Sequence, residues 1–343
     1  MDAAEMVHGQ DRMETPACLC GAVTADRRLA ARDDVTGASF TYLHCPACDL
    51  ERLSPRPPIE DMARFYPDEY VPYNDPPPDP ASRGERIKRL VYETFYATPE
   101  ECAPAVRRWR WALRRLLAPV RQHGVLAFAP PAVRTVFEYG AGTGNDLLAF
   151  RHAGWEVSGC EPSAQARAVA RRRGIELRPC TAEAADPPDG VGCIYMNNVF
   201  EHRHDPRAVL AKSLARLQPG GLLVLVVPNH RAWSARLFGA AWPGYDPPKH
   251  IWGFTPRAIR LVLERAGFEL LSIDQRYPFS NHCWWAAISG VRLAQPRLPG
   301  LRLRLANALR RLLVPVGMLA AFAGHADYIK VVARKPQSAV ATR

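Results

Sequence analysis

The sequence lacks an apolar run long enough to cross a lipid bilayer. Its most apolar late stretch, residues 312–324, contains Pro315 and is shorter than the ~20 residues that a membrane-spanning helix requires. The start of the chain, Met1 to Glu5, is acidic and is followed by no apolar segment, so we expect no secretory signal. These absences predict a cytoplasmic protein. No internal repeat is found either.

Acidic side chains are in the minority. The chain has 34 Asp and Glu residues against 45 Lys and Arg residues, which gives a net charge of +11. This balance permits contact with phosphate-bearing partners or an anionic membrane face, and a genome rich in arginine codons explains it equally well. No RNA- or DNA-binding module accompanies the charge, so we expect no nucleic-acid partner. The oligomeric state stays open.

What is present is the composition of an ordinary globular protein, 48% apolar and 23% charged. A chain of 343 residues can form a doubly wound core and a smaller appended unit. Its 32 prolines cluster in loops, where they act as rigid breaks. Composition and motifs divide the chain into a disordered tail (1–16), a cysteine module (17–53), a Pro-rich linker (54–83), a helical segment (84–130), an α/β domain (131–335) and a second tail (336–343).

Apolar strands and helices alternate through the α/β domain. Strands are predicted at residues 132–139, 156–160, 176–180, 192–197, 222–227, 269–274 and 328–333. Helices are predicted at residues 145–153, 164–173, 206–217 and 256–266. This alternation predicts an α/β fold with a doubly wound, mostly parallel seven-stranded sheet that is covered on both faces.

A glycine-rich loop follows the first of these strands and opens a helix, which is the context that a nucleotide-binding loop needs. Its glycines are Gly140, Gly142 and Gly144, whereas a dinucleotide fingerprint would place its third glycine at Asn145. Glu138 would repel a phosphate there but suits the ammonium group of an amino acid. A glycine turn in some other α/β protein is the alternative interpretation.

A second acid, Glu161, stands at the end of the next strand, where a carboxylate can accept both ribose hydroxyls of a nucleoside. Together with the glycine loop it resembles motif I and the following acidic strand end of class I S-adenosylmethionine-dependent methyltransferases. The resemblance covers residues 17–70 and 130–335 and implies a Rossmann-like methyltransferase fold. Further segments that carry it are residues 195–206, 217–222, 227–229 and 242–254.

The segment 242–254 is similar to a lid seen in one bacterial subgroup of these enzymes. That subgroup carries an N-terminal cysteine module and often acts on sugars, polysaccharide precursors or natural-product intermediates. The resemblance implies S-adenosylmethionine as the cofactor. The residues it implies as cofactor-binding are Glu138, Gly140, Ala141, Gly142, Gly144, Glu161, Pro162, Thr181, Ala182, Asn197 and Asn198.

Two positions depart from the family pattern. The acid that usually precedes the fourth strand is absent from Val191-Gly192-Cys193. The adenine-side acid after the third strand is replaced by Thr181, so its hydroxyl and the backbone of Ala182 are the expected adenine contacts.

Methyl transfer is an in-line displacement, so the protein must position the acceptor and remove its proton. Histidine serves as a base near neutral pH with little tuning. His202 follows the carboxyl end of the fourth strand, His250 lies on the expected lid, and His204 is expected at the surface. Glu201 would orient the His202 ring or bind the acceptor. For His202, helix capping or contact with the methionine end of the cofactor is the alternative.

Nine cysteines without a signal peptide indicate thiols or a metal site rather than a disulfide framework. Two pairs, Cys18 with Cys20 and Cys45 with Cys48, lie in a segment too small to have its own core. Thiolates paired at loop tips are how a zinc ribbon closes, which predicts a structural Zn²⁺. The similar family module has C-x-x-C in both places, whereas the first pair here is C-x-C. A module without metal and a redox pair are the alternatives.

Two Arg-rich stretches, residues 107–117 and 301–313, have amphipathic patterns. Each fits peripheral contact with the inner, anionic membrane face and a lipid-linked acceptor. Packing of the apolar face on the core is the other interpretation. We therefore expect a methyltransferase that acts on an oxygen or carbon of a small-molecule, sugar or glycan- or lipid-linked precursor. A quinone-type O-methyltransferase and a non-catalytic scaffold are the alternatives.

Overall fold

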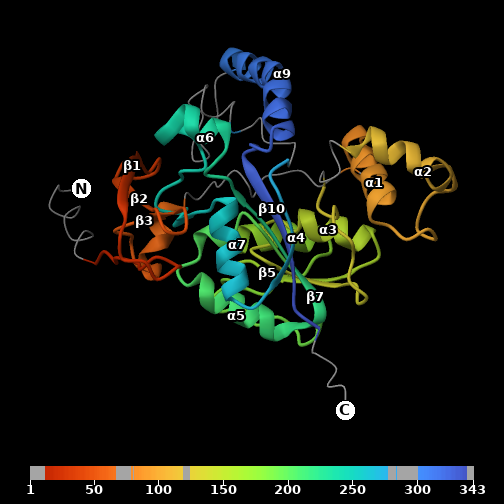
Figure 1. The fold of residues 1–343 in the computed structure, drawn as a ribbon, viewed down its shortest axis with the longest axis horizontal. Coiled ribbons are helices and arrows are strands. Elements are labelled where there is room, and N and C mark those ends of the chain that lie inside the picture. Colours follow the sequence, from red (N-terminus) through yellow and green to blue (C-terminus); the bar gives the residue numbers. More distant parts are fainter. Residues whose placement is uncertain are drawn as a thin grey trace.

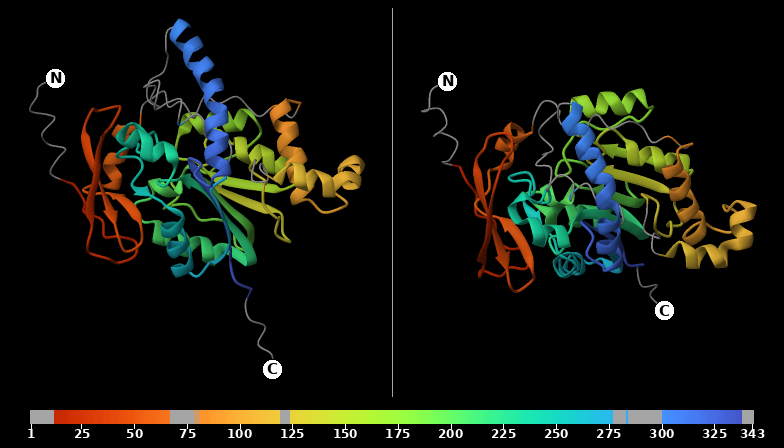
Figure 2. Two further views of the ribbon diagram at one scale, coloured as in Figure 1. Left: turned by 45° about the horizontal axis from the view of Figure 1, so that its top comes forward. Right: turned by 90° about the horizontal axis from the view of Figure 1, so that it is seen from above.

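A computed structural model describes residues 12–66, 79, 81–118, 124–276, 283 and 300–337. Most of the predicted N-terminal tail and part of the predicted linker lie outside these residues. A central α/β domain separates a small β-sheet module at one end from a pair of helices at the other (Figures 1 and 2).

The central sheet has six strands in the order β5-β4-β6-β7-β10-β9. Only β10 runs antiparallel to its neighbours, which confirms the doubly wound, mostly parallel sheet. The strands are β4 (Thr135–Tyr139), β5 (Glu156–Cys160), β6 (Val191–Asn197), β7 (Leu217–Pro228), β9 (Glu269–Asp274) and β10 (Tyr328–Arg334).

The predicted strand at residues 176–180 is reduced to a single bridge between Cys160 and Arg178. Its exposed and buried side chains alternate, as expected at a sheet edge, but the chain turns after Arg178. The Cys180 N–H donates to the Arg178 carbonyl at 3.0 Å, which ends the pairing.

Helices cover both faces of this sheet. One buried cluster joins Ile194 of β6 to side chains of α5 and α7, and another joins Tyr195 of the same strand to α3 and α4. Successive residues of a strand point to opposite faces, so β6 contributes to both cores. The helices are α3 (Asn145–His152), α4 (Ala164–Arg172), α5 (Pro206–Arg216) and α7 (Pro256–Arg265).

Local sequence sets where these helices begin. Ser163, Asp205 and Thr255 are N-caps whose side chains accept a backbone N–H from the first turn of α4, α5 and α7. Proline occupies the first turn of α5 and α7, where its missing N–H costs nothing.

The N-terminal module is an antiparallel sheet of β1 (Asp26–Arg32), β2 (Ser39–Cys45) and β3 (Leu50–Leu53). Its fourth strand, β8 (Trp252–Gly253), belongs to the α/β domain and follows β4 to β7 in the sequence. Leu50 and Cys45 also belong to the same buried cluster as Ile251 and Phe254. The module is therefore continuous with the larger domain.

Two segments were expected to be irregular but are ordered. Glu14 forms a backbone bridge with Arg56, so residues 12–16 do not belong to the predicted tail. A 3-10 helix, η1 (Ile59–Phe65), lies in the predicted linker because Met62 and Phe65 bury apolar side chains there.

The remaining elements surround the α/β domain. Among the described helices, none combines the length and apolar character needed to cross a membrane. The helices are α1 (Arg83–Phe95), α2 (Pro104–Leu116), η4 (Phe200–His202), α6 (Trp233–Phe238), η5 (Gly239–Ala241) and α9 (Gly300–Phe322).

Candidate active site

A cavity of about 1650 Å³ opens where β4 and β6 end. Ligands in doubly wound folds bind at this edge of the sheet. It is bordered on other sides by α1, the end of η1 and the segment 242–250. The predicted site residues that line it are Glu138, Gly140, Ala141, Gly142, Glu161, Pro162, Thr181, Asn197, Asn198, His202 and His250. Three do not: Gly144 caps α3, Ala182 is buried in the core, and Glu201 lies behind His202.

The glycine loop has a conformation that other residues rarely adopt. Gly140 and Gly142 have φ values of +62° and +53°. A Cβ at Gly140 would lie 2.7 Å from Val199, whereas one at Gly142 would meet nothing within 4 Å. Gly142 therefore leaves open space on the cavity side, where a ligand can approach the backbone.

Three carboxyl groups gather at this loop, of which Glu138 and Glu161 are buried and Asp146 is partly buried. Glu138 is 3% exposed, and its Oε2 has no hydrogen-bond partner among the described residues. Burial and the nearby charges of Asp146 and Glu161 raise the pKa of Glu138 well above its usual range. Burial also raises the pKa of Asp146, although its carboxylate accepts from the side-chain amide of Asn197 at 2.8 Å. Such a cluster favours a cationic ligand and disfavours a diphosphate.

Glu161 connects the glycine loop to α4. Its Oε2 accepts from the Gly142 N–H at 3.0 Å, and its Oε1 accepts from the Ser163 N–H at 2.8 Å. Burial raises the pKa of Glu161, and the two backbone donors act in the opposite direction. Each carboxylate oxygen keeps a further lone pair that can accept from a ligand hydroxyl. The orphaned Glu138 oxygen, the open space at Gly142 and the anionic surroundings fit a sulfonium nucleoside that bears an ammonium group.

His202 and His250 meet on the opposite side of the cavity. Their ring centroids are 4.6 Å apart and the rings are nearly perpendicular. Nδ1 of His250 donates to the Gly244 carbonyl at 2.8 Å, which leaves its Nε2 as an acceptor. Burial lowers the pKa of both rings, so both are neutral at physiological pH.

Glu201 is completely buried next to this pair. Its Oε1 lies 4.0 Å from Nε2 of His202, and neither of its oxygens has a hydrogen-bond partner among the described residues. Burial raises the pKa of Glu201 to about 8. Burying a carboxyl group that has no hydrogen-bond donor costs folding free energy. Such groups are typically found at functional sites.

The structure adds residues that the sequence did not indicate. Tyr66, at the end of η1, places its hydroxyl 3.4 Å from Nδ1 of His202 and lines the cavity. His204 is half-buried rather than at the surface, with Nε2 3.0 Å from the Pro57 carbonyl. Asp146 follows the glycine loop directly, and its place in the first turn of α3 was a usable signal.

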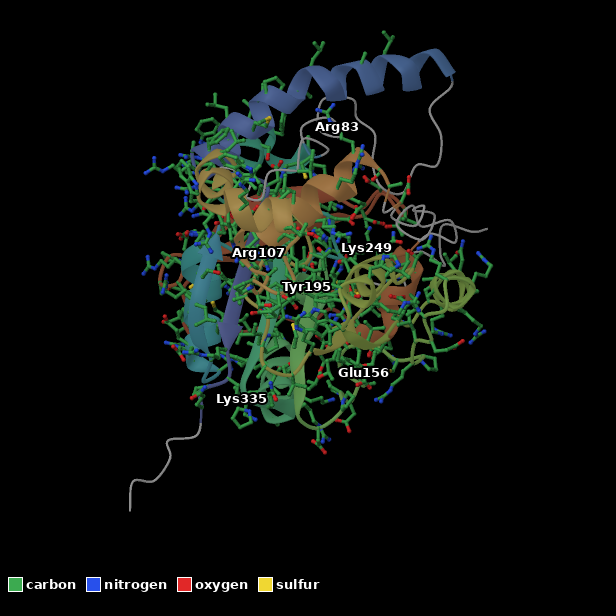
Figure 3. All side chains as sticks on the ribbon, turned by 90° about the vertical axis from the view of Figure 1, so that its right-hand side faces the viewer. Arg83, Arg107, Glu156, Tyr195, Lys249 and Lys335 are labelled. Carbon is green, nitrogen blue, oxygen red and sulfur yellow. The ribbon has the colours of Figure 1, made fainter. Side chains whose placement is uncertain are left out.

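The N-terminal module holds the segment that carries His250. The Tyr42 hydroxyl donates to the His250 carbonyl at 2.7 Å. Lys249, labelled in Figure 3, is buried between Asp246 at 2.8 Å and Asp33 of the module at 3.7 Å. The module therefore contacts the segment that borders the cavity.

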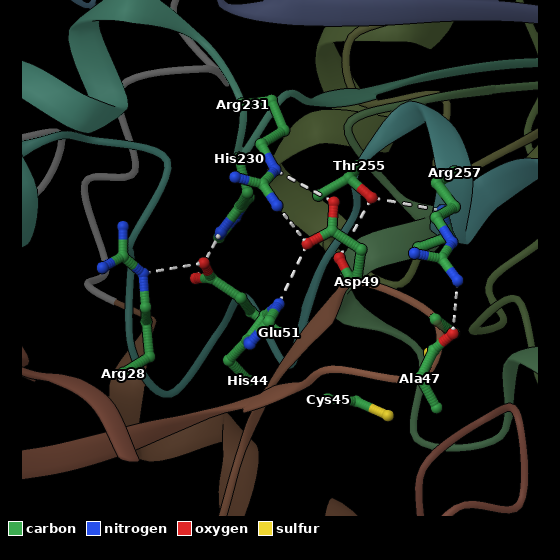
Figure 4. A network of polar contacts seen from close by, with 12 residues as sticks. Arg28, His44, Cys45, Ala47, Asp49, Glu51, His230, Arg231, Thr255 and Arg257 are labelled. Carbon is green, nitrogen blue, oxygen red and sulfur yellow. Dashed lines mark hydrogen bonds and ion pairs between the residues drawn. The ribbon is translucent and has the colours of Figure 1, made fainter. Parts of the chain in front are cut away.

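Figure 4 shows a second connection, centred on Glu51 of β3. Its carboxylate lies 3.0 Å from Nδ1 of His230 and accepts from Nε of Arg28 at 3.1 Å. The Tyr245 hydroxyl donates to the same carboxylate at 2.5 Å. Because Glu51 is almost completely buried, this network fixes the module against the end of β7 and the segment 242–250.

The four cysteines of the module lie together. Sγ of Cys18 is 3.5 Å from that of Cys48, and Sγ of Cys20 is 3.4 Å from Cys18 and 3.6 Å from Cys45. Four thiolates around a tetrahedral zinc ion lie ~3.8 Å apart, so this donor set fits the metal. Although burial of Cys20 opposes ionisation, the Ala22 N–H and the neighbouring thiols lower its pKa to about 7.

Residues 108–273 match the family model described as "Methyltransferase domain". Residues 108–273, just under half of the chain, therefore resemble a methyltransferase domain, and the mostly parallel central sheet has the Rossmann-like fold of such domains.

Among curated relatives, a ubiquinone biosynthesis O-methyltransferase of Rhodopseudomonas palustris is 33% identical over 106 residues, 29% of this chain and 42% of the relative. A tRNA U34 carboxymethyltransferase of Pseudoalteromonas translucida is 28% identical over 187 residues, 48% of this chain and 51% of the relative. The C-methyltransferase NovU of Streptomyces niveus is 36% identical over 99 residues, 27% of this chain and 24% of the relative. The chain thus spans from about a quarter to about half the length of these relatives.

Proposed function

We propose that the protein transfers the methyl group of S-adenosylmethionine to an oxygen or carbon atom of a small-molecule, sugar or glycan- or lipid-linked precursor. One observation carries this proposal. A single cavity contains both the glycine loop with its buried carboxyl groups and the neutral pair His202 and His250. A cofactor subsite and a proton-accepting subsite that share one cavity are what methyl transfer requires.

The chain's residues act on the cofactor from several strands. When bound, S-adenosylmethionine supplies a methyl group on a sulfonium centre that is already activated. Glu161 accepts the ribose hydroxyls, and Glu138 lies at the ammonium end. The remaining proposed contacts come from Gly140, Ala141, Gly142, Pro162, Thr181, Asn197 and Asn198, in part through their backbones, whereas Gly144 and Ala182 do not line the cavity.

The acceptor lies against the two histidines. His202 would take the acceptor's proton, and the bound cofactor would supply the methyl group to the acceptor atom and keep the electron pair of its carbon–sulfur bond on sulfur. Glu201 and His250 position the His202 ring. Tyr66 closes the same side of the cavity.

The relatives favour two acceptor chemistries. The ubiquinone biosynthesis O-methyltransferase supports an oxygen atom as the acceptor, and the C-methyltransferase NovU supports a carbon atom. A nucleic-acid acceptor is not proposed, because no RNA-binding module accompanies the basic charge.

The cysteine cluster holds a structural Zn²⁺ through Cys18, Cys20, Cys45 and Cys48. Support comes from their mutual distances and from the Ala22 N–H, which donates to Sγ of Cys20 at 3.4 Å. Backbone N–H groups that point at thiolates stabilise their negative charge.

Peripheral membrane contact is proposed for α2. This helix has no acidic residue in its first turn and no buried residue, and Trp109 and Trp111 are 54% and 65% exposed. Leu305 and Leu312 of α9 are exposed as well. Arginines with exposed tryptophans suit an anionic lipid surface. Co-sedimentation with anionic but not neutral vesicles, lost in Trp109→Ala/Trp111→Ala, is the expected result.

The proposed function is tested by calorimetry and a methyl-transfer screen. Binding of S-adenosylmethionine and of its demethylated product is expected, together with transfer of labelled methyl to at least one quinol, sugar or polyketide-type acceptor. His202→Ala should retain cofactor binding and lose turnover. A protein that binds neither cofactor form is a scaffold, and that result would overturn the proposal.

A further inference from the structure

We propose that Glu201, His202 and His250 form a binding site for a divalent transition-metal ion, separate from the cysteine cluster. The inference goes beyond the proposed function, and only the role of the ion toward an acceptor rests on it. The site would take a cation such as Zn²⁺, Fe²⁺, Mn²⁺ or Co²⁺ at the acceptor side of the cavity.

The ligand atoms are already close together. One nitrogen from each histidine and one oxygen of Glu201 all lie within 4.8 Å of one another. Ligands around a metal at ~2.1 Å are separated by about 3 to 3.5 Å, so the side chains need to approach by only about 1 Å. Two neutral imidazoles and one carboxylate form the facial donor set that binds divalent first-row metals.

The Glu201 carboxyl group provides an independent observation. It is 0% exposed, and neither oxygen has a hydrogen-bond partner among the described residues. Nε2 of His202 lies 4.0 Å from its Oε1, too far for a hydrogen bond. A cation between these atoms would satisfy the buried oxygen, whereas a purely structural role leaves it without a partner.

The outer contacts of the ligands also suit a metal. The hydrogen bond from Nδ1 of His250 to the Gly244 carbonyl fixes the ring and directs the lone pair of Nε2 elsewhere. Carbonyl acceptors behind ligating histidines have this orienting effect. Nearby cations do not occupy the site: Lys249 pairs with Asp246 at 2.8 Å and Arg203 with Glu183 at 2.9 Å.

Because His202 and His250 border the cavity, the ion would be accessible from it. Such an ion would bind an acceptor oxygen and favour its deprotonated form, and the proton would leave to solvent. With the ion bound, the ligating nitrogens of His202 and His250 would both coordinate it. His202 would then no longer act as the base. Metal content and methyl transfer are therefore measured separately.

The test is a titration of the full-length, EDTA-treated protein with Co²⁺, followed by absorption spectroscopy and metal analysis. Two equivalents per chain are expected. One should give a thiolate charge-transfer band from the cysteine cluster, and the other only weak visible bands from nitrogen and oxygen ligands. Cys48→Ser should abolish the first signal and leave the second.

Glu201→Gln and His250→Ala should each weaken the second equivalent by at least about tenfold, as expected when one ligand is lost. His204→Ala, a half-buried histidine of the same cavity outside the trio, is the matched control and should retain both equivalents. Circular dichroism confirms that each variant is folded.

Absence of the nitrogen- and oxygen-ligated Co²⁺ signal, or a signal of this kind that survives both substitutions, overturns the inference. Either result leaves the proposed methyl transfer intact with His202 as the base. Failure of the proposed function would appear instead as absent binding of S-adenosylmethionine, with two metal equivalents still present.

Discussion

At the scale of single residues, Glu161 has two tasks, because its oxygens hold the glycine loop and face the cavity. We expect Glu161→Ala to weaken S-adenosylmethionine binding by roughly 100-fold, since two hydrogen bonds to a charged group contribute about 3 kcal/mol. Calorimetry measures the affinity. Glu156→Ala, at the exposed start of the same strand (Figure 3), is the control and should bind normally. Unchanged affinity in Glu161→Ala would refute the ribose contact.

The two glycines of the loop make a second, paired prediction. Gly140→Ala places a Cβ 2.7 Å from Val199, so it should lower the melting temperature as well as cofactor affinity. Gly142→Ala meets no protein atom within 4 Å. Its stability loss should come only from the positive φ, about 1 kcal/mol, while affinity falls about tenfold or more. Thermal unfolding with and without cofactor separates the two. Equal stability losses would contradict this interpretation.

Cavity residues at the carboxyl ends of strands could be predicted from the sequence, because parallel strands bring these ends to one edge of the sheet. Glu138, Gly142, Glu161 and His202 were found in this way and line the cavity or its rim. Tyr66 was not, because it is separated from His202 by 136 positions and belongs to a segment that resembled a linker. Proline content predicts where regular structure breaks, but it does not show which tertiary surface the segment covers.

At the scale of elements, β10 carries an unusual buried charge. Lys330 is 1% exposed, and its Nζ donates to the Gly124 and Val125 carbonyls at 2.9 and 3.2 Å. Burial lowers the pKa of Lys330 to about 7, although Asp146 and Asp274 act in the opposite direction. β10 thereby anchors a segment that lines the cavity.

Lys330 predicts a pH dependence of stability. The unfolded chain keeps this proton to about pH 10.4, and the folded chain releases it near 7, so folding becomes more favourable as pH rises between these values. Relative to Lys330→Met, the wild type should gain up to about 1.4 kcal/mol per pH unit in this window. Urea unfolding at pH 6 to 10 measures the difference. Parallel profiles for the two proteins would contradict the assignment.

Several helix and strand boundaries in the α/β domain were predictable because local signals agree with the tertiary structure, but β7 begins at Leu217 and not at residue 222 as predicted. Thr255 and Pro256 begin α7 where expected, and β5 and β9 have the predicted limits. The pairing of β3 with β8 was not predictable, because a two-residue strand 200 positions away has no periodicity of its own. The position of β8 is defined by the packing of Ile251 and Phe254 into the core that the module and the α/β domain share.

At the scale of the whole molecule, the cysteine module and the cavity form one structure. β8, the Tyr42 contact and the ion pair of buried Lys249 with Asp33 all join the module to the segment that carries His250. A small antiparallel sheet buries little apolar area on its own, so the proposed zinc ion should supply much of its folding free energy. Loss of the ion should therefore spread to the segment 242–254.

Removal of the proposed zinc ion by a chelator tests this coupling. We expect a lower melting temperature and faster amide hydrogen exchange in residues 242–254, because their partners in β2 and β3 lose order, while β4 to β6 stay protected. Cys48→Ser should show the same faster exchange without chelator, because it removes the ion of the cysteine cluster alone. Cys102→Ser, a buried cysteine outside the cluster, should exchange like the wild type. If the metal is lost and exchange in 242–254 stays the same, the module is a passive appendage, and His250 is positioned by the α/β domain alone.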